Sequence, residues 1–319
     1  TPFFRRVDWS AFWASFILSF AVYFYTMAPT VGLEDAGELA VASDYLGVPH
    51  PPGYPLWTML TWVFTKVFSF VTFRGQPNPA WSVTLFSVVT GALASGLTAL
   101  LISRSGADLL QASREASHTA DRKTDNRICW IGGVVGSLVF SFSPVMWSQS
   151  VIIEVYSLNA LFLMLLFVLT YNWLRRPSDK LLFATAFVFG LGLTNYQVLL
   201  LAALPLAVAI LLKDVDLFRD FLIVGIVFVV TIAIIKMASL PEMVGFPKHD
   251  PANAKIYEGI AEHTPLLRHP KHYVHVLLSL GFVVVMSGVV RWRWRPRSWP
   301  PVATGVLAIA VVILLAVLV

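Results

Sequence analysis

Long apolar runs separated by short polar stretches make up most of the chain. Several runs reach the ~20 residues that a helix needs to cross a bilayer. The pattern predicts an all-α, polytopic membrane protein with about nine transmembrane helices. The predicted spans are 9–27, 81–103, 128–147, 155–174, 181–193, 198–212, 221–240, 274–290 and 302–319.

Positive charges predict which way these runs cross. Arg5 and Arg6 precede the first run and place the N-terminus in the cytoplasm, because Lys and Arg collect on the inner side of a membrane. If the run 57–73 also crossed, the basic segment 104–127 would lie outside. We therefore expect 57–73 to be an interfacial or re-entrant helix at the outer face. Its polar side is predicted to comprise Thr58, Thr61, Thr65 and Lys66.

With this topology, most of the 23 Lys and Arg residues lie inside, including those of the predicted cytoplasmic loop 104–127. The loops 29–56 and 241–273 then lie outside. The distinctive polar groups at the ends of the apolar runs all fall at the outer face, which predicts one extracytoplasmic polar cavity. They are Asp35, Glu38, His50, Gln149, Glu154, Asn195 and Gln197.

Composition agrees with a membrane protein. The 319 residues are 57% hydrophobic and 13% charged, whereas a soluble domain carries about 25% charged residues. The net charge of +5 comes from short clusters between apolar runs, so it indicates topology and not nucleic-acid binding. The single cysteine, Cys129, can form no intrachain disulfide.

The stretch Pro29 to Leu56, PTVGLEDAGELAVASDYLGVPHPPGYPL, combines carboxylates, a histidine and a proline cluster beside a span. If a helix starts near Ala36, Asp35 and Glu38 share a face. They would then serve either as helix caps or, for Asp35, as a general base that activates a hydroxyl acceptor. His50 is either a surface residue or a ligand for phosphate or substrate.

Two later clusters add candidates. Glu154 begins a span, and on one continuous helix it shares a face with Trp147 and Ser150. A glutamate in this position normally needs a partner or a polar cavity. Asn195 and Gln197 follow a glycine-containing helix and would bind sugar hydroxyls or neighbouring helices.

Arg268 and Lys271, in the outer loop, would bind a phosphate or simply be solvated. No cluster has the spacing of metal ligands and no nucleotide-binding motif occurs, so no cofactor is expected, although a divalent metal stays open.

In this order, three motifs resemble those of the transmembrane protein 260-like protein O-mannosyltransferases and their bacterial relatives. The first, Pro29 to Leu56, is similar to the family pattern PTV…DSGE…LGVxHPPGYPL. Pro144 to Gln149 and Glu154 to Leu161 resemble PxxWSQ…EVYSLNAL, and Gly190 to Tyr196 resembles GLxLTNH. Ala36 stands in place of the family serine, and Tyr196 in place of the family histidine.

The resemblance implies a GT-C superfamily glycosyltransferase with a bundle of membrane helices and a polyprenyl-phosphate-linked sugar as donor. Asp35 matches the catalytic aspartate, while Glu38, His50, Glu154, Asn195, Tyr196 and Gln197 are expected to bind substrate. The reaction would be inverting, with a hydroxyl of a protein Ser or Thr, or of a glycan, as acceptor. Family members are longer, which implies a further C-terminal part.

We thus expect a multi-pass protein of the cytoplasmic (inner) membrane whose partners are membrane lipids, the lipid-linked sugar and an acceptor protein or complex, without nucleic acid. The alternative is a non-catalytic family member that serves as a structural membrane subunit of a larger complex. A transporter is disfavoured by the lack of charged residues at mid-membrane.

Overall fold

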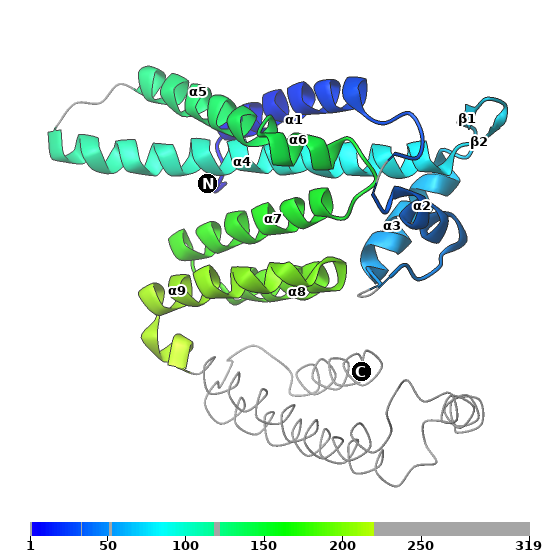
Figure 1. The fold of residues 1–319 in the computed structure, drawn as a ribbon. Helices are drawn as coiled ribbons and strands as arrows, with labels where there is room; N and C mark the ends of the chain where they lie inside the picture. The colour runs from blue at the N-terminus through cyan, green and yellow to red at the C-terminus, as the bar shows by residue number, and fades with distance from the viewer. Residues whose placement is uncertain (1, 33, 51–52, 118–121, 220–319) are drawn as a thin grey trace, which may run out of the picture. The chain divides into compact units, whose positions relative to one another are not determined.

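The computed structural model describes residues 2–32, 34–50, 53–117 and 122–219 (Figure 1). The chain divides into two compact units, Thr1–Lys213 and Asp214–Val319. All the elements α1 to α9 lie in the first unit. The predicted spans 221–240, 274–290 and 302–319 lie outside the described residues, as does the loop 241–273.

One long helix, α4, is the centre of the first unit. Helices α1, α5 and α7 pack directly against it, and α8 packs against the other side of α7 (Figure 1). The short helix α6 follows α5, and a 3₁₀ turn, η1, leads from α8 to α9. The bounds are α1 Arg6–Thr26, α4 Pro79–Ser117, α5 Arg122–Ser141, α6 Pro144–Ser150, α7 Tyr156–Arg175, α8 Asp179–Asn195, η1 Gln197–Ala202 and α9 Ala203–Lys213.

The helices fit a membrane. Within the described residues three are long and apolar enough to cross one: Arg6–Thr26, Pro79–Ser113 and Tyr156–Arg175. A fourth candidate is the pair Lys123–Ser141 and Pro144–Ser150, which is bent by 71°. The bend lies where Pro144 cannot donate a backbone hydrogen bond and Ser143 caps the new helix by accepting from the Met146 N–H at 3.4 Å. These observations confirm a helical, multi-pass membrane protein.

The segment 104–127, predicted as a cytoplasmic loop, begins inside a helix. Helix α4 continues to Ser117 and α5 begins at Arg122, so most of this basic segment is helical. Apolar periodicity ends near Ser103, but Ala, Leu, Gln and Arg continue beyond it, and these residues have high helix propensity. At about 1.5 Å per residue, α4 is longer than the ~30 Å hydrocarbon core of a bilayer.

Two short helices and a hairpin lie at one end of the bundle. Helix α2 (Ala36–Tyr45) and helix α3 (Pro55–Val67) pack against each other and against α4. A two-stranded hairpin follows, in which β1 (Thr72–Phe73) pairs antiparallel with β2 (Gln76–Pro77). The predicted helix 57–73 therefore ends at Val67, six residues early.

The threonine side of α3 faces the protein, and its apolar side is exposed. Thr58, Thr61 and Thr65 are buried, while Met59 and Val63 are exposed. The Thr61 hydroxyl contacts the Ser43 hydroxyl of α2 at 2.8 Å, and each of the three threonines also donates to a backbone carbonyl of its own helix. Hydroxyls satisfied in this way can be buried, and the apolar face is left for lipid.

Small residues bring α1 and α5 close to α4. A Cβ on Gly96 of α4 would lie 2.8 Å from the ring of Phe12, and a Cβ on Gly133 of α5 would lie 2.8 Å from the Ala99 carbonyl oxygen. Hydroxyl pairs also join these helices: Ser19 of α1 contacts Ser95 of α4 at 2.8 Å, and Ser137 of α5 contacts Ser15 of α1 at 2.7 Å. Such small-residue contacts and interhelical hydrogen bonds are the usual basis of helix packing in membranes.

Gly133→Ala should therefore destabilise the bundle, because the new methyl group meets backbone atoms of α4 that cannot move aside. We expect a loss of about 1–3 kcal/mol, measured by thermal unfolding of the purified protein in detergent. Gly132→Ala is the matched control, since nothing lies within 4 Å of its Cβ position. Equal midpoints for the two variants would contradict this packing.

Candidate functional site

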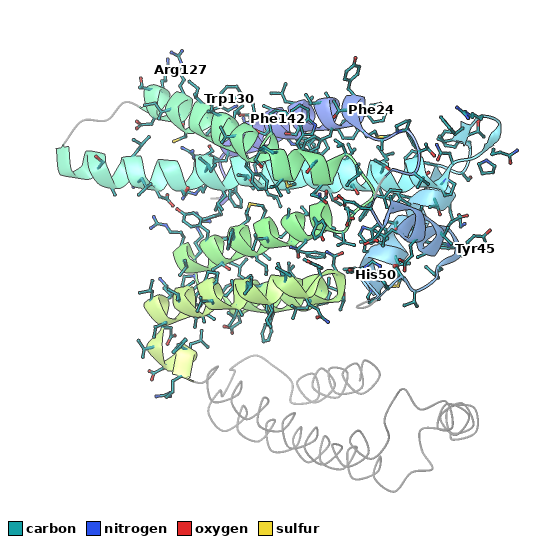
Figure 2. All side chains as sticks on the ribbon, in the orientation of Figure 1. Phe24, Tyr45, His50, Arg127, Trp130 and Phe142 are labelled. Atoms are coloured by element: carbon teal, nitrogen blue, oxygen red, sulfur yellow. The ribbon has the colours of Figure 1, made fainter. Side chains whose placement is uncertain are left out.

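The candidate site lies at the end of the bundle where α2 and α3 sit. Here the end of α1 and the start of α4 meet the start of α7 and the end of α8 (Figure 1). His50 and Tyr45 lie at this end of the unit, and Arg127 of α5 lies at the other (Figure 2). Segments far apart in the sequence thus bring their polar residues to one place.

Asp35 stands immediately before α2, but it does not cap the helix. It occupies the N-cap position and its side chain makes no capping hydrogen bond. Glu34, just before it, has a φ of 62°, a left-handed conformation that few non-glycine residues adopt. The Asp35 side chain is 61% exposed. The capping interpretation is therefore wrong for Asp35, and its carboxylate is accessible.

Glu38, one turn into α2, holds His50 by two contacts. One carboxylate oxygen accepts the His50 backbone N–H at 2.6 Å, and the other lies 3.1 Å from His50 Nδ1. These hydrogen bonds lower the pKa of Glu38. Because an ionised carboxylate only accepts hydrogen bonds, Nδ1 carries the proton. The other ring nitrogen, Nε2, lies 3.2 Å from the Tyr54 hydroxyl and 3.9 Å from Asp35 Oδ2.

The turn after His50 places Tyr54. The Gly53 N–H donates to the His50 carbonyl at 2.9 Å, and Gly53 and Tyr54 have φ values of 87° and 42°. The first is cheap only for glycine. Pro55 then begins α3 at a position where its missing N–H costs nothing. Tyr54 is buried, and burial together with nearby Tyr196 and carboxylates raises its pKa.

Glu154 shares no helix with Trp147 and Ser150, so the common face that one continuous helix would give them does not form: α6 ends at Ser150 and α7 begins at Tyr156. It occupies the irregular segment between them and is only 6% exposed. Its Oε2 accepts the Val155 N–H at 3.2 Å, and its backbone carbonyl accepts from Ser87 Oγ of α4 at 3.3 Å.

Burial raises the pKa of Glu154 to about 7, and the neighbouring carboxylates of Glu34 and Asp35 contribute to the rise. Glu154 and the loop before α2 are thus close in space, as the sequence predicted. Glu34 was missed as a candidate. The signal was present, because it directly precedes Asp35 in the same polar interruption of the apolar sequence.

The residues that follow the glycine-containing helix, Asn195 to Gln197, mainly make contacts within the protein. Asn195 is 1% exposed and its Nδ2 donates to the Val155 carbonyl at 3.3 Å, while its Oδ1 has no partner within the described residues. The ring of Tyr196 lies edge-on to Tyr156 at 5.2 Å and 6.4 Å from Tyr54. Gln197 is exposed and makes no hydrogen bond with the described part of the chain.

Three of the predicted site residues lie together: His50 contacts Glu38 and lies 3.9 Å from Asp35. Glu154 is near this group because it interacts with Glu34 and Asp35. Tyr196 is near it because its ring lies 6.4 Å from that of Tyr54. Arg268 and Lys271 lie outside the described residues. In the part of the chain that the structure describes, no group of three His, Cys, Asp or Glu residues is arranged to hold a metal ion.

Comparison with known proteins gives a consistent match. The family model described as "Protein O-mannosyl-transferase TMEM260 N-terminal domain" matches residues 35–218. A Dictyostelium discoideum protein named protein O-mannosyl-transferase tmem260 is 30% identical over 205 residues, 60% of this chain and 22% of that protein. A Mus musculus protein with the corresponding name is 31% identical over 210 residues, 64% of this chain and 26% of that protein.

The chain therefore aligns with only about a quarter of the length of these curated relatives. No solved structure matches it. The matched region begins at Asp35 and includes the residues around Glu38, His50, Glu154 and Tyr196.

The raised pKa of Glu154 makes a pH-dependent prediction. The Glu154 carboxyl binds its proton more tightly in the folded protein than in the unfolded chain. Below the pKa of the unfolded chain the carboxyl is protonated in both states and does not reduce stability. As the pH rises toward 7, unfolding releases the proton, so the folded protein becomes progressively less stable. Glu154→Gln should therefore stabilise the protein at pH 8, by up to about 3 kcal/mol, and by much less at pH 4.5. Thermal unfolding at both pH values measures this; a gain that does not depend on pH would contradict it.

Proposed function

Because the chain belongs to the TMEM260 family of protein O-mannosyl-transferases, we propose that it is the membrane-embedded part of a glycosyltransferase. The enzyme moves a sugar from a polyprenyl-phosphate carrier to a hydroxyl of an acceptor at the extracytoplasmic face. The names of the curated relatives favour mannose as the sugar and a protein as the acceptor.

One observation carries this proposal: the accessible Asp35 carboxylate lies beside a histidine that Glu38 orients. A carboxylate that is neither capping a helix nor buried in an ion pair is free to accept a proton. As the acceptor oxygen attacks the anomeric carbon, Asp35 takes the hydroxyl proton. The bond from that carbon to the phosphate oxygen breaks, and the polyprenyl phosphate leaves with the electron pair, which inverts the configuration of the sugar.

The neighbours of Asp35 have complementary roles. The Tyr54 hydroxyl, 3.2 Å from His50 Nε2, offers a hydrogen bond to the departing phosphate. His50 Nε2, the ring nitrogen without the proton, accepts a hydrogen bond from a sugar or acceptor hydroxyl. With a pKa of about 7, Glu154 is largely protonated below neutral pH and then donates a hydrogen bond to a sugar hydroxyl or a phosphate oxygen, where a carboxylate would repel the anion.

The lipid part of the donor needs an apolar path to the site. Helix α3 provides one, because its exposed face carries Met59, Trp62 and Val63 while its threonines face inward. A prenyl chain lying along this face would bring the phosphate to the start of α3, where Tyr54 and His50 lie. A nucleotide-binding site is then unnecessary.

Exposure favours catalysis over a purely structural role in a larger complex. A scaffold has no use for accessible ionisable groups at a membrane edge, since these are costly to keep there. Yet the side chains of Asp35, Glu38 and His50 are 61%, 49% and 37% exposed. The basic residues at the opposite end of the bundle support an extracytoplasmic site, because positive charges favour the cytoplasmic side.

Asp35→Asn should reduce turnover by about 10²–10⁴-fold, the usual contribution of a general base. The assay uses purified full chain with polyprenyl-phosphate mannose and an acceptor peptide. Asp44→Asn, in the same helix α2, is the control: Asp44 pairs with Lys66 at 2.9 Å and should be dispensable. If Asp35→Asn matches the wild type while the preparation is active, Asp35 is not the base.

Glu38→Gln should change the protonation of His50. An amide can accept from the backbone N–H, but its NH₂ group then faces Nδ1, which must accept instead of donate. The proton moves to Nε2, and turnover should fall about 10-fold or more through loss of a charge-assisted hydrogen bond. Nitrogen NMR shifts of His50 report the tautomer, and Glu38→Asp should partly restore it. An unchanged tautomer would show that Glu38 does not orient the ring.

A further inference from the structure

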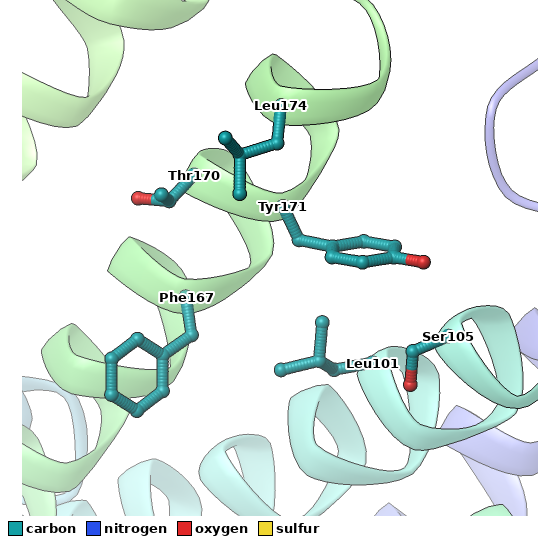
Figure 3. A pocket seen from close by; sticks show the side chains of 6 residues that line it. All are labelled: Leu101, Ser105, Phe167, Thr170, Tyr171 and Leu174. Carbon is teal, nitrogen blue, oxygen red and sulfur yellow. The ribbon is translucent and has the colours of Figure 1, made fainter. Parts of the chain in front are cut away.

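A small groove lies between α4 and α7, at the end of the bundle opposite Asp35. Its volume is about 310 Å³, at the lower limit of the roughly 300–1,000 Å³ of typical ligand pockets. The walls are largely apolar, with hydroxyls from Ser105, Thr170 and Tyr171 (Figure 3). The lining residues are Leu101, Ser105, Phe167, Thr170, Tyr171 and Leu174.

Cationic groups adjoin the groove through one shared carboxylate. Asp108 pairs with Arg104 Nη2 at 2.9 Å and with Arg175 Nε at 3.1 Å. It also accepts a hydrogen bond of 2.6 Å from the hydroxyl of Tyr171, a lining residue. Two guanidinium groups therefore share one carboxylate, which leaves an excess positive charge.

Some of the donors in this cluster are unused. Arg104 Nε is buried and has no acceptor in the part of the chain that the structure describes, although a buried unsatisfied donor is costly. The Arg175 side chain is about half exposed and only its Nε is paired there. The Phe3 ring lies 4.9 Å from the Arg104 guanidinium and 5.4 Å from that of Arg176, which keeps the cations together.

We propose that this groove binds one anionic phospholipid, with an acyl chain between α4 and α7 and its phosphate on Arg104 and Arg175. Arginine donors suit phosphate oxygens, and basic pockets between membrane helices are typical sites for anionic headgroups. The groove lies along the last two turns of α7, which is a candidate membrane span. Its apolar walls therefore lie at the depth of the acyl chains in a bilayer.

This lipid is distinct from the sugar donor. Tyr171 follows Tyr156, at the Asp35 end of α7, by fifteen residues, which on a helix is roughly 22 Å. By the same charge asymmetry that places Asp35 outside, the groove lies in the cytoplasmic leaflet. The lipid site therefore does not depend on the proposed glycosyltransferase activity, and either can fail without the other.

Native mass spectrometry of the delipidated full chain in detergent tests the proposal. Phosphatidylglycerol should bind at least about tenfold more tightly than phosphatidylcholine with the same acyl chains, because only the former has a net negative headgroup. Glycerol phosphate, which lacks acyl chains, should bind far more weakly than phosphatidylglycerol. Equal binding of the two lipids, or equal binding of glycerol phosphate and phosphatidylglycerol, would overturn the proposal.

Two variants separate the headgroup contact from the groove. Arg175→Gln should weaken phosphatidylglycerol binding about tenfold, while Arg127→Gln, the same charge change at the same end on α5, should leave it within about twofold. Leu174→Trp fills the groove without touching Asp108 and should weaken both lipids. Circular dichroism checks that each variant is folded. If folded Arg175→Gln binds like Arg127→Gln, or folded Leu174→Trp like the wild type, the lipid lies elsewhere.

Discussion

The close approach of α1 and α5 to α4 is the contact on which the rest of the first unit depends. Lipid is as apolar as leucine, so helices in a membrane gain little from burying apolar surface and rely on tight packing and hydrogen bonds. Gly96 and Gly133 allow that packing. The Ser19–Ser95 pair satisfies buried hydroxyls between α1 and α4, and the Ser137–Ser15 pair satisfies them between α5 and α1. The position of α4 then determines where both ends of its neighbours lie.

At the site end, α4 and its neighbours fix the irregular segment that carries Glu154. The Val151 carbonyl accepts from Ala28 N–H at 2.8 Å, the Glu154 carbonyl from Ser87, and the Val155 carbonyl from Asn195. Three different parts of the chain thus hold five residues that form no helix. The Glu154 carboxyl is therefore kept away from solvent, and this burial raises its pKa.

Apolar periodicity predicted the long helices of the described residues well. Charge asymmetry predicted that Asp35, Glu38, His50 and Glu154 lie at one end of the helices. The failures have physical causes. Periodicity does not show whether threonines face water or another helix, so the inward orientation of the α3 threonines could not be predicted. It also continued the predicted span 128–147 through Pro144, where a proline and a cap break the helix. The Glu38–His50 contact depends on a turn with left-handed residues, which sequence spacing does not determine.

We propose that residues from three distant segments form one sugar-binding site at the α2 and α3 end. Photolabelling tests it most directly, with a polyprenyl-phosphate mannose that carries a diazirine on the sugar and peptide mapping by mass spectrometry. We expect labelled peptides around Asp35 and His50, around Glu154, and around Tyr196, and we expect unmodified donor to compete with the labelling. Labelling that instead maps to the Arg104 and Arg175 end, or that the unmodified donor does not displace, would contradict it.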